Sequence, residues 1–188
     1  MCSHRRATSL WWTPPTVRAR GLPRRWYSRG VDDLSLEPMI PSEFELLKTG
    51  LIERFATEQI EAGNWKPEDA LRMSLAEINR LLPRGLDTAG VLLLSARTTD
   101  GSTVGHVWMA IEPRPSAAGE AWIYDIEIVE GRRGQGFGRR LLGAAEAAAA
   151  RHGATWLGLN VFGSNDAARQ LYSSSGYEIK ALQLRKRL

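Results

Sequence analysis

The most informative part of the sequence is a glycine-rich loop between a predicted strand at 121–129 and a predicted helix. Glycines recur there at alternate positions, Gly134, Gly136 and Gly138. Glycine allows left-handed backbone conformations and lets a ligand approach the main chain closely. Free N–H groups at the start of the helix would point at one spot, where the helix dipole favours negative charge. The spacing therefore predicts a cradle for a pyrophosphate. Neighbouring arginines could add charge-assisted hydrogen bonds: Arg133, Arg139 and Arg140.

Two common phosphate-binding motifs do not fit this loop. A P-loop needs Gly-Lys-Ser or Gly-Lys-Thr after four spacer residues, and the loop has neither. A dinucleotide fingerprint spaces its glycines G-x-G-x-x-G and is followed by an acid about 20 residues later. Here the spacing is G-x-G-x-G, and 153–162 contains no acid. A plain glycine-rich turn remains an alternative for the loop alone.

A second pattern follows the loop: the run NDAARQLY at 165–172, then Gly176-Tyr177. Together with Arg133-x-x-Gly136-x-Gly138, it resembles the GNAT superfamily of N-acetyltransferases. The patterns of that family are (Gln or Arg)-x-x-Gly-x-(Gly or Ala) and Asn-x-x-Ala-x-x-Leu-Tyr-x-x-x-Gly-(Phe or Tyr). The resemblance covers roughly residues 33–188 and implies acetyl-CoA as co-substrate.

The resemblance also implies roles for individual residues. Backbone groups of Ile126 and Ile128 would pair with the pantetheine arm as an added strand does. Asn165 would contact the coenzyme arm. Tyr172 would act as the general acid that protonates the departing thiolate, with core packing as the alternative. The implied cofactor-binding residues are Ile126, Glu127, Ile128, Arg133, Gly134, Gln135, Gly136, Phe137, Gly138, Arg139, Asn165 and Tyr172.

The attacking amine must be neutral, so a base or a water chain is needed. Asp125 and Glu127 lie two apart on the predicted strand and therefore share one face, opposite Ile126 and Ile128. We take Glu127 as the candidate base; the alternative is an acid in a hydrogen-bonded network or one that attracts ammonium groups. No spacing supports a covalent acyl-enzyme, so the expected mechanism is direct attack in a ternary complex.

The acceptor is expected to be a primary amine on a small molecule. Acetylation of a protein N-terminus or lysine, and a non-catalytic acyl-CoA sensor, are the alternatives. Three aromatic residues could line an acceptor pocket or belong to the core, and core packing is the safer prediction: Phe44, Trp65 and Trp108.

The periodicities predict the elements that would position these residues. Strands are expected at 34–38, 91–96, 104–111, 121–129 and 155–161, and a last β segment begins at Tyr177-Glu178-Ile179. Helices are expected from Ser42 as N-cap to about 62, at 66–82, from Gly138 to about 151, and at 165–174. Asp100-Gly101 predicts a hairpin turn. The fold class is α/β (α+β): a mixed, mostly antiparallel sheet with a splayed parallel pair, flanked by helices.

Charge and composition limit the remaining possibilities. Residues 1–31 hold seven arginines and no acid, whereas residues 32–188 carry 18 basic and 21 acidic residues. The segment 1–31 is interpreted as a disordered tail, a mis-called start or a transit peptide, and 32–188 as the catalytic domain. No nucleic-acid partner is expected, no membrane span, and no metal, because the three histidines show no ligand spacing. A cytoplasmic location is expected, and the sequence is compatible with a homodimer.

Overall fold

The computed structural model describes residues 34–111 and 119–186. The arginine-rich segment 1–31 therefore lies outside the described residues, as do residues 113–118 of the connection expected between the strands at 104–111 and 121–129. Within the described ranges, no helix combines the length and the apolarity needed to cross a bilayer.

Five strands form one sheet in the order β1-β2-β3-β4-β5. The first four are antiparallel neighbours, and β4 pairs with β5 in parallel. This confirms the predicted mixed sheet with one parallel pair. The strands are β1 (Leu34–Pro38), β2 (Val91–Thr98), β3 (Thr103–Ile111), β4 (Glu120–Ile128) and β5 (Trp156–Leu159).

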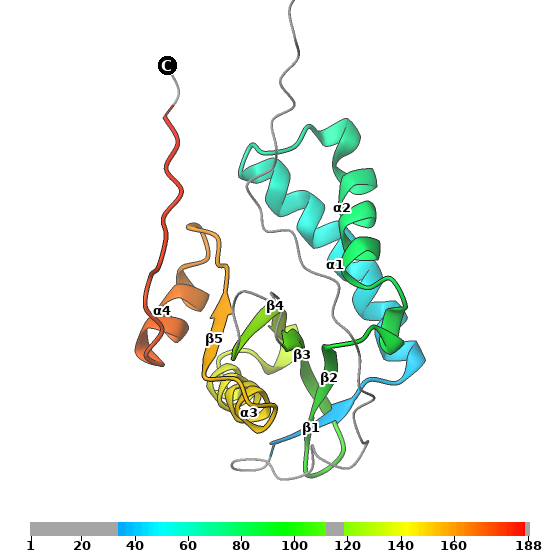
Figure 1. Ribbon diagram of the computed structural model, residues 1–188, viewed down its shortest axis with the longest axis vertical. Coiled ribbons are helices and arrows are strands. Elements are labelled where there is room, and N and C mark those ends of the chain that lie inside the picture. The colour runs from blue at the N-terminus through cyan, green and yellow to red at the C-terminus, as the bar shows by residue number, and fades with distance from the viewer. Residues whose placement is uncertain (1–33, 112–118, 187–188) are drawn as a thin grey trace, which may run out of the picture.

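Helices cover both faces of the sheet (Figure 1). The helix after the glycine loop packs on one face through its alanines and leucines, over the apolar side chains of β1, β3 and β4. A pair of antiparallel helices covers the other face and buries Phe44 and Trp108 in a second core cluster, so these two are core residues. The helices are α1 (Pro41–Glu61), α2 (Pro67–Leu81), α3 (Phe137–Arg151) and α4 (Asp166–Ser174), with short 3-10 turns η1 (Gly85–Asp87) and η2 (Glu130–Arg132).

Two sequence predictions about element ends are wrong. The N-cap of α1 is Ile40 rather than Ser42, because Pro41 occupies the first helical position and the Glu43 carboxylate accepts from the Ile40 N–H at 3.2 Å. The β segment predicted from Tyr177 is not a strand: residues 177–186 are extended but have no paired neighbour among the described residues. The Asp100-Gly101 turn is confirmed, with Gly101 left-handed at φ 82°.

Glu43 links the start of α1 to strand β2 of the sheet. Its carboxylate accepts from the buried Ser95 hydroxyl at 2.8 Å and from Arg97 Nη2 at 2.6 Å. Burial alone would raise the pKa of Glu43, but the Ser95 and Ile40 hydrogen bonds and the Arg97 charge outweigh it and lower the pKa. Glu43 therefore links α1 to β2 in its charged form.

Glu43→Ala is expected to lower the free energy of unfolding by about 1–3 kcal/mol at pH 7, because Ser95 loses its acceptor inside the protein. Because the pKa of Glu43 is lower in the folded state, its charged form stabilises the folded state at pH values above the pKa of the unfolded chain. This contribution is lost as the pH falls through the pKa of the folded state. The difference between variant and wild type should therefore shrink on acidification, as measured by urea denaturation. Glu45→Ala, at an exposed position of the same helix, is the control; an equal loss in both variants would contradict this role.

Candidate active site

The glycine loop has the backbone conformation expected of an anion cradle. Gly134 and Gly136 are left-handed, with φ of 74° and 80°. Gly136 is the N-cap of α3. A Cβ atom at either position would meet no protein atom within 4 Å. The loop is therefore open on the side where a ligand would approach.

The backbone N–H groups of residues 134–139 have no hydrogen-bond partner within the described part of the chain. The first helical turn after Gly136 contributes some of them, since an α-helix leaves its first N–H groups free. The α3 dipole adds partial positive charge at the same place. These amides are therefore available to bind an anion such as a pyrophosphate.

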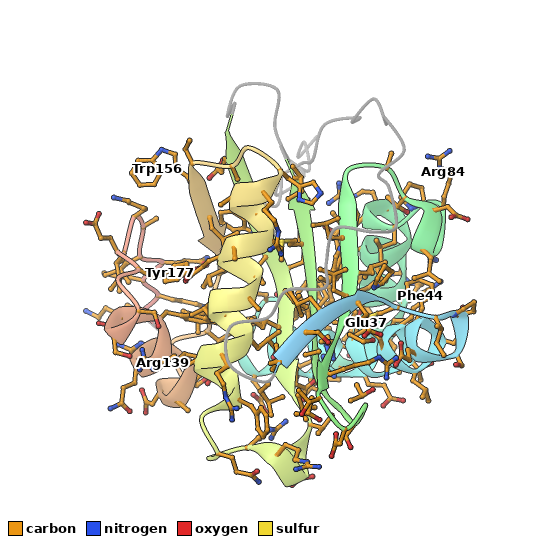
Figure 2. The ribbon with its side chains drawn as sticks, turned by 90° about the horizontal axis from the view of Figure 1, so that it is seen from below. Glu37, Phe44, Arg84, Arg139, Trp156 and Tyr177 are labelled. Atoms are coloured by element: carbon orange, nitrogen blue, oxygen red, sulfur yellow. The ribbon has the colours of Figure 1, made fainter. Side chains whose placement is uncertain are left out.

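The three arginines near the loop are bound to protein. Arg139 donates from α3 to Ser174 Oγ at 2.8 Å and so holds α4 against α3 (Figure 2). Arg140 donates to the Gln135 carbonyl at 3.2 Å. Arg133 donates to the Ile128 carbonyl at 3.0 Å and to Glu127 at 2.7 Å. These contacts hold the arginines to the protein but use only part of their donors, so remaining N–H groups of the three side chains could still support an anion beside the backbone amides.

A β-bulge in β4 creates the open strand edge. Trp108 of β3 pairs with Asp125, but Met109 pairs with Ile123, so Tyr124 is an extra residue in β4. Tyr124 stacks on Trp108, with ring centroids 4.7 Å apart. Pairing of β4 with β5 ends at Ile123, directly before the bulge. Beyond this point the two parallel strands separate.

The backbone groups of Ile126 and Ile128 point to the side of β4 where pairing with β5 has already ended. Val129 N–H donates to Val104 O of the β3 segment at 2.9 Å. Because backbone groups alternate in direction along a strand, those of Ile126 and Ile128 face away from β3. The edge predicted for pairing with a coenzyme arm is thus accessible, and Arg133 already uses one lone pair of the Ile128 carbonyl.

Helix α4 carries the other two predicted residues. Asn165 is its N-cap, and its Oδ1 accepts from the Ala168 N–H at 3.1 Å. Tyr172 packs against the α3-side core and lies 5.6 Å from the ring of Tyr177. Burial raises the pKa of Tyr172, and the negative charge of Asp125 raises it further. The Tyr172 hydroxyl therefore stays protonated at neutral pH.

Asp125 and Glu127 share the face of β4 that α1 covers, as predicted. Arg54 of α1 reaches both, at 3.3 Å from Asp125 and 3.0 Å from Glu127. Arg133 binds the other Glu127 oxygen. Burial would raise the pKa of Asp125, but the hydrogen bonds and charges of His106 and Arg54 outweigh it, so the pKa is lowered.

His106 is a member of this cluster that sequence reasoning missed. Its Nε2 lies 2.5 Å from Asp125 Oδ2, and it stands opposite Glu127 in the β3–β4 ladder. His106 lies two residues before Trp108 and therefore on the same face of β3. Nothing in the sequence showed that β3 and β4 would pair in the register that brings His106 to Asp125. Ligand atoms of His106, Asp125 and Glu127 lie within 4.8 Å of one another. Two guanidinium groups already neutralise the carboxylates, which disfavours a metal cation there.

Glu58 adds a further acid to this region, one turn after Arg54 on α1. Burial raises the pKa of Glu58, the Arg54 charge opposes the rise, and the charges of Asp125, Glu61 and Glu127 add to it. Burial is thus the main cause of the raised pKa of Glu58, and the neighbouring carboxylates add to it.

Glu58→Gln is expected to raise the melting temperature by about 1–3 °C at pH 7. A raised pKa in the folded state means that stability falls as the pH rises from the unfolded pKa, about 4.3, through the folded pKa. The gain should therefore disappear below about pH 4. Differential scanning calorimetry at both pH values tests this, with the exposed Glu53→Gln as control. A lower melting temperature for Glu58→Gln at pH 7 would contradict the raised pKa of Glu58.

Comparison with known proteins gives concordant results. Residues 54–177 match the Acetyltransferase (GNAT) family. YycN of Bacillus subtilis strain 168, named as an uncharacterized N-acetyltransferase, is 36% identical over 155 residues, which cover 82% of this chain and 99% of YycN. YdgE of the same organism, named in the same way, is 29% identical over 154 residues, covering 82% and 98%.

Solved structures agree with the sequence relatives. The crystal structure of YycN superposes with a TM-score of 0.78 and covers 82% of this chain and 98% of YycN. An aminoglycoside acetyltransferase from an uncultured soil metagenomic sample, crystallised with sisomicin, is 18% identical with a TM-score of 0.51, covering 84% and 97%. At that identity the likeness shows the fold alone. The match over most of the domain, together with 36% identity to a full-length relative, shows that this chain belongs to the GNAT family of acetyltransferases.

Proposed function

We propose that the protein transfers the acetyl group of acetyl-CoA to a primary amine of a small molecule, by direct attack within a ternary complex. The observation that carries this proposal is the run of amides at 134–139, unpartnered within 34–111 and 119–186, beside the open edge of β4. A diphosphate fits those amides, and an extended arm fits the edge. Bound acetyl-CoA would supply an activated thioester.

The chain's own residues have distinct parts in this proposal. The amides of Gly134 to Arg139 hold the pyrophosphate, while the backbone of Ile126 and Ile128 aligns the arm, next to Glu127. Asn165, whose Oδ1 caps α4, has its amide nitrogen left for the arm. Tyr172 donates a hydrogen bond, and then a proton, to the sulfur as the carbon–sulfur bond breaks.

The acidic cluster under α1 is the proposed acceptor side. Glu58, next to the ion-paired Asp125 and Glu127, is the carboxylate proposed to attract an ammonium group, and a proton must leave the nitrogen before it attacks. Because α1 lies over these carboxylates and Arg54 contacts two of them, the space suits a small amine better than a folded protein. Protein N-termini and lysines are the alternative acceptors.

Glu127 is the proposed base, and the geometry supplies a second candidate. Both Glu127 oxygens are bound to arginines, so an incoming proton would have to displace an ion pair. His106 Nε2 lies at hydrogen-bond distance from the Asp125 carboxylate, and a neutral ring that donates from Nε2 would carry its lone pair on Nδ1. Asp125 would then orient the His106 ring, as a carboxylate orients the histidine of a catalytic triad.

Matched glutamine variants distinguish the two bases. If Glu127 takes the proton, Glu127→Gln should lower kcat by about 100-fold or more, and His106→Gln by less than about tenfold. The reverse order would assign the proton to His106. The measurement is kcat against pH, because loss of the base also removes the acidic limb of the profile.

A thiol-release assay with a panel of amines tests the function itself. Small primary amines, peptides with free N-termini and lysine peptides would be supplied with acetyl-CoA, and the product identified by mass spectrometry. Acetylation of a small amine is the expected result. Protection of the fold by acetyl-CoA without thiol release on any amine would favour a non-catalytic acyl-CoA sensor instead.

A further inference from the structure

Two aromatic side chains near the end of α1 lie outside the core. Phe55 of α1 and Trp65, which directly precedes the N-cap of α2, contact each other edge to face, with ring centroids 5.1 Å apart. Both side chains are only partly buried. Among the described residues, the two hydrophobic clusters include Phe44 and Trp108 but neither member of this ring pair. Of the three aromatic residues that could line an acceptor pocket, Trp65 is thus the one that the core does not contain.

Phe55 is a neighbour of Glu58 on the surface of α1. The two residues are three positions apart on the helix, which places their Cβ atoms about 5–6 Å apart. One turn before Glu58, Arg54 reaches Asp125 and Glu127 of β4, and the charges of both β4 carboxylates act on Glu58. The ring pair is therefore adjacent to the acidic cluster that forms the proposed acceptor side.

Glu58 differs from the other acids of this cluster in its pairing. Asp125 and Glu127 form ion pairs with arginines, whereas Glu58 forms none within residues 34–111 and 119–186. One carboxylate is thus left to receive one ammonium group. The site suits an amine with a single positive charge better than a polyamine.

The connection between α1 and α2 holds Trp65 in position. The backbone N–H groups of Asn64 and Trp65 donate to the Gln59 carbonyl at 2.9 and 3.2 Å. The Asn64 side chain donates to Gln59 Oε1 at 2.8 Å, and Gln59 itself is only 7% exposed. Because these bonds tie the turn to a buried part of α1, the ring of Trp65 is already ordered. A ligand that packs on it therefore pays little for ordering the protein.

The rings and the carboxylate suit the two ends of one molecule. Partly exposed rings gain free energy when an apolar group covers them, and another aromatic ring can do so by offset or edge-to-face contact. The carboxylate attracts the ammonium form of an amine. Because the spacing between the side chains of Phe55 and Glu58 is about 5–6 Å at Cβ, a short carbon linker joins a ring at one to a nitrogen at the other.

We infer that the acceptor is a small primary amine that carries an aromatic ring on a short carbon linker, with the ring packed on Phe55 and Trp65 and the nitrogen beside Glu58. This inference rests on the proposed acetyl transfer and names its substrate class. The bonds that change are those of that reaction. The nitrogen forms the amide bond and gives up one proton to the base, while the carbon–sulfur bond breaks and the sulfur takes one proton from Tyr172.

Initial rates with two matched amines test the contact with the rings. The value of kcat/KM for 2-phenylethylamine should exceed that for ethylamine by about tenfold or more, because apolar groups that a site covers discriminate at this level. Phe55→Ala and Trp65→Ala should each lower kcat/KM for phenylethylamine by about tenfold, mainly through KM, and change the value for ethylamine by less than about threefold. The matched control is Trp156→Ala, at a tryptophan of β5 that is 67% exposed, and it should leave both values near those of the wild type.

Binding measured without turnover separates recognition from chemistry. Calorimetric titration of phenylethylamine into the full chain, with coenzyme A present in place of acetyl-CoA, gives the dissociation constant. Phe55→Ala should weaken binding by about tenfold. Phe55→Leu keeps an apolar side chain and should restore part of the affinity, and circular dichroism checks that each variant is folded.

The outcomes distinguish this inference from the proposed function. Acetylation of both amines without a preference for phenylethylamine overturns the inference and leaves acetyl transfer intact, as do equal losses for both amines in the ring variants. Faster acetylation of a peptide with an N-terminal phenylalanine than of phenylethylamine overturns the assignment to a small molecule. Acetylation of no amine at all overturns the proposed function, and this inference with it.

Discussion

Gly136→Val is expected to weaken acetyl-CoA binding by about 100-fold or more, the largest effect of any single substitution in the loop. Gly136 has φ 80°, a region that a β-branched residue rarely adopts. Valine would therefore turn the backbone and move the amides of 134–139 away from their common target. Losing two charge-assisted hydrogen bonds, each about 1.5–3 kcal/mol, corresponds to at least that loss of affinity.

The valine side chain would also block the ligand sterically, in addition to its effect on the backbone. A Cβ at Gly136 meets no protein atom, so the valine side chain would occupy the open side from which the diphosphate approaches. Isothermal titration with acetyl-CoA measures the loss. Gly143→Val is the matched control, since Gly143 lies within α3 and a Cβ there also meets open space; its affinity should stay near that of the wild type. Wild-type affinity in Gly136→Val would contradict the proposed cradle.

Tyr172→Phe is expected to lower kcat by about 100- to 10,000-fold while changing the dissociation constant of acetyl-CoA by less than about threefold. The substitution keeps the ring and its packing but removes the proton offered to the sulfur. Because the pKa of Tyr172 is raised, the wild-type enzyme should keep this proton beyond pH 10. Steady-state kinetics and titration calorimetry separate turnover from binding.

The neighbouring tyrosine provides the control for Tyr172→Phe. Tyr177 lies 5.6 Å from Tyr172, and its pKa is raised by burial and then by the charge of Glu146. Its hydroxyl is buried on the core side, so Tyr177→Phe should retain turnover. Equal activity of wild type and Tyr172→Phe would remove Tyr172 from the acid role, and equal losses in both variants would indicate a packing effect.

Local patterns in the sequence determined most of the elements and the glycine loop. Period-two and period-3.6 apolar spacing located the strands and helices, and the alternating glycines allow the left-handed conformations that Gly134 and Gly136 adopt. That Asp125 and Glu127 lie on the same face of β4 also followed from strand periodicity alone. These features depend on residues close in the chain, which is why the sequence was enough.

Contacts between distant residues were decided only by the tertiary structure. The bulge at Tyr124 opens β4 from β5, because Tyr124 stacks on Trp108 across the ladder. His106 joins Asp125, and Arg54 reaches both β4 carboxylates, only once α1 and β3 are packed against β4. The segment after Tyr177 has strand-like residues, yet a strand also needs a neighbour to pair with, and within the described residues of one copy none is present.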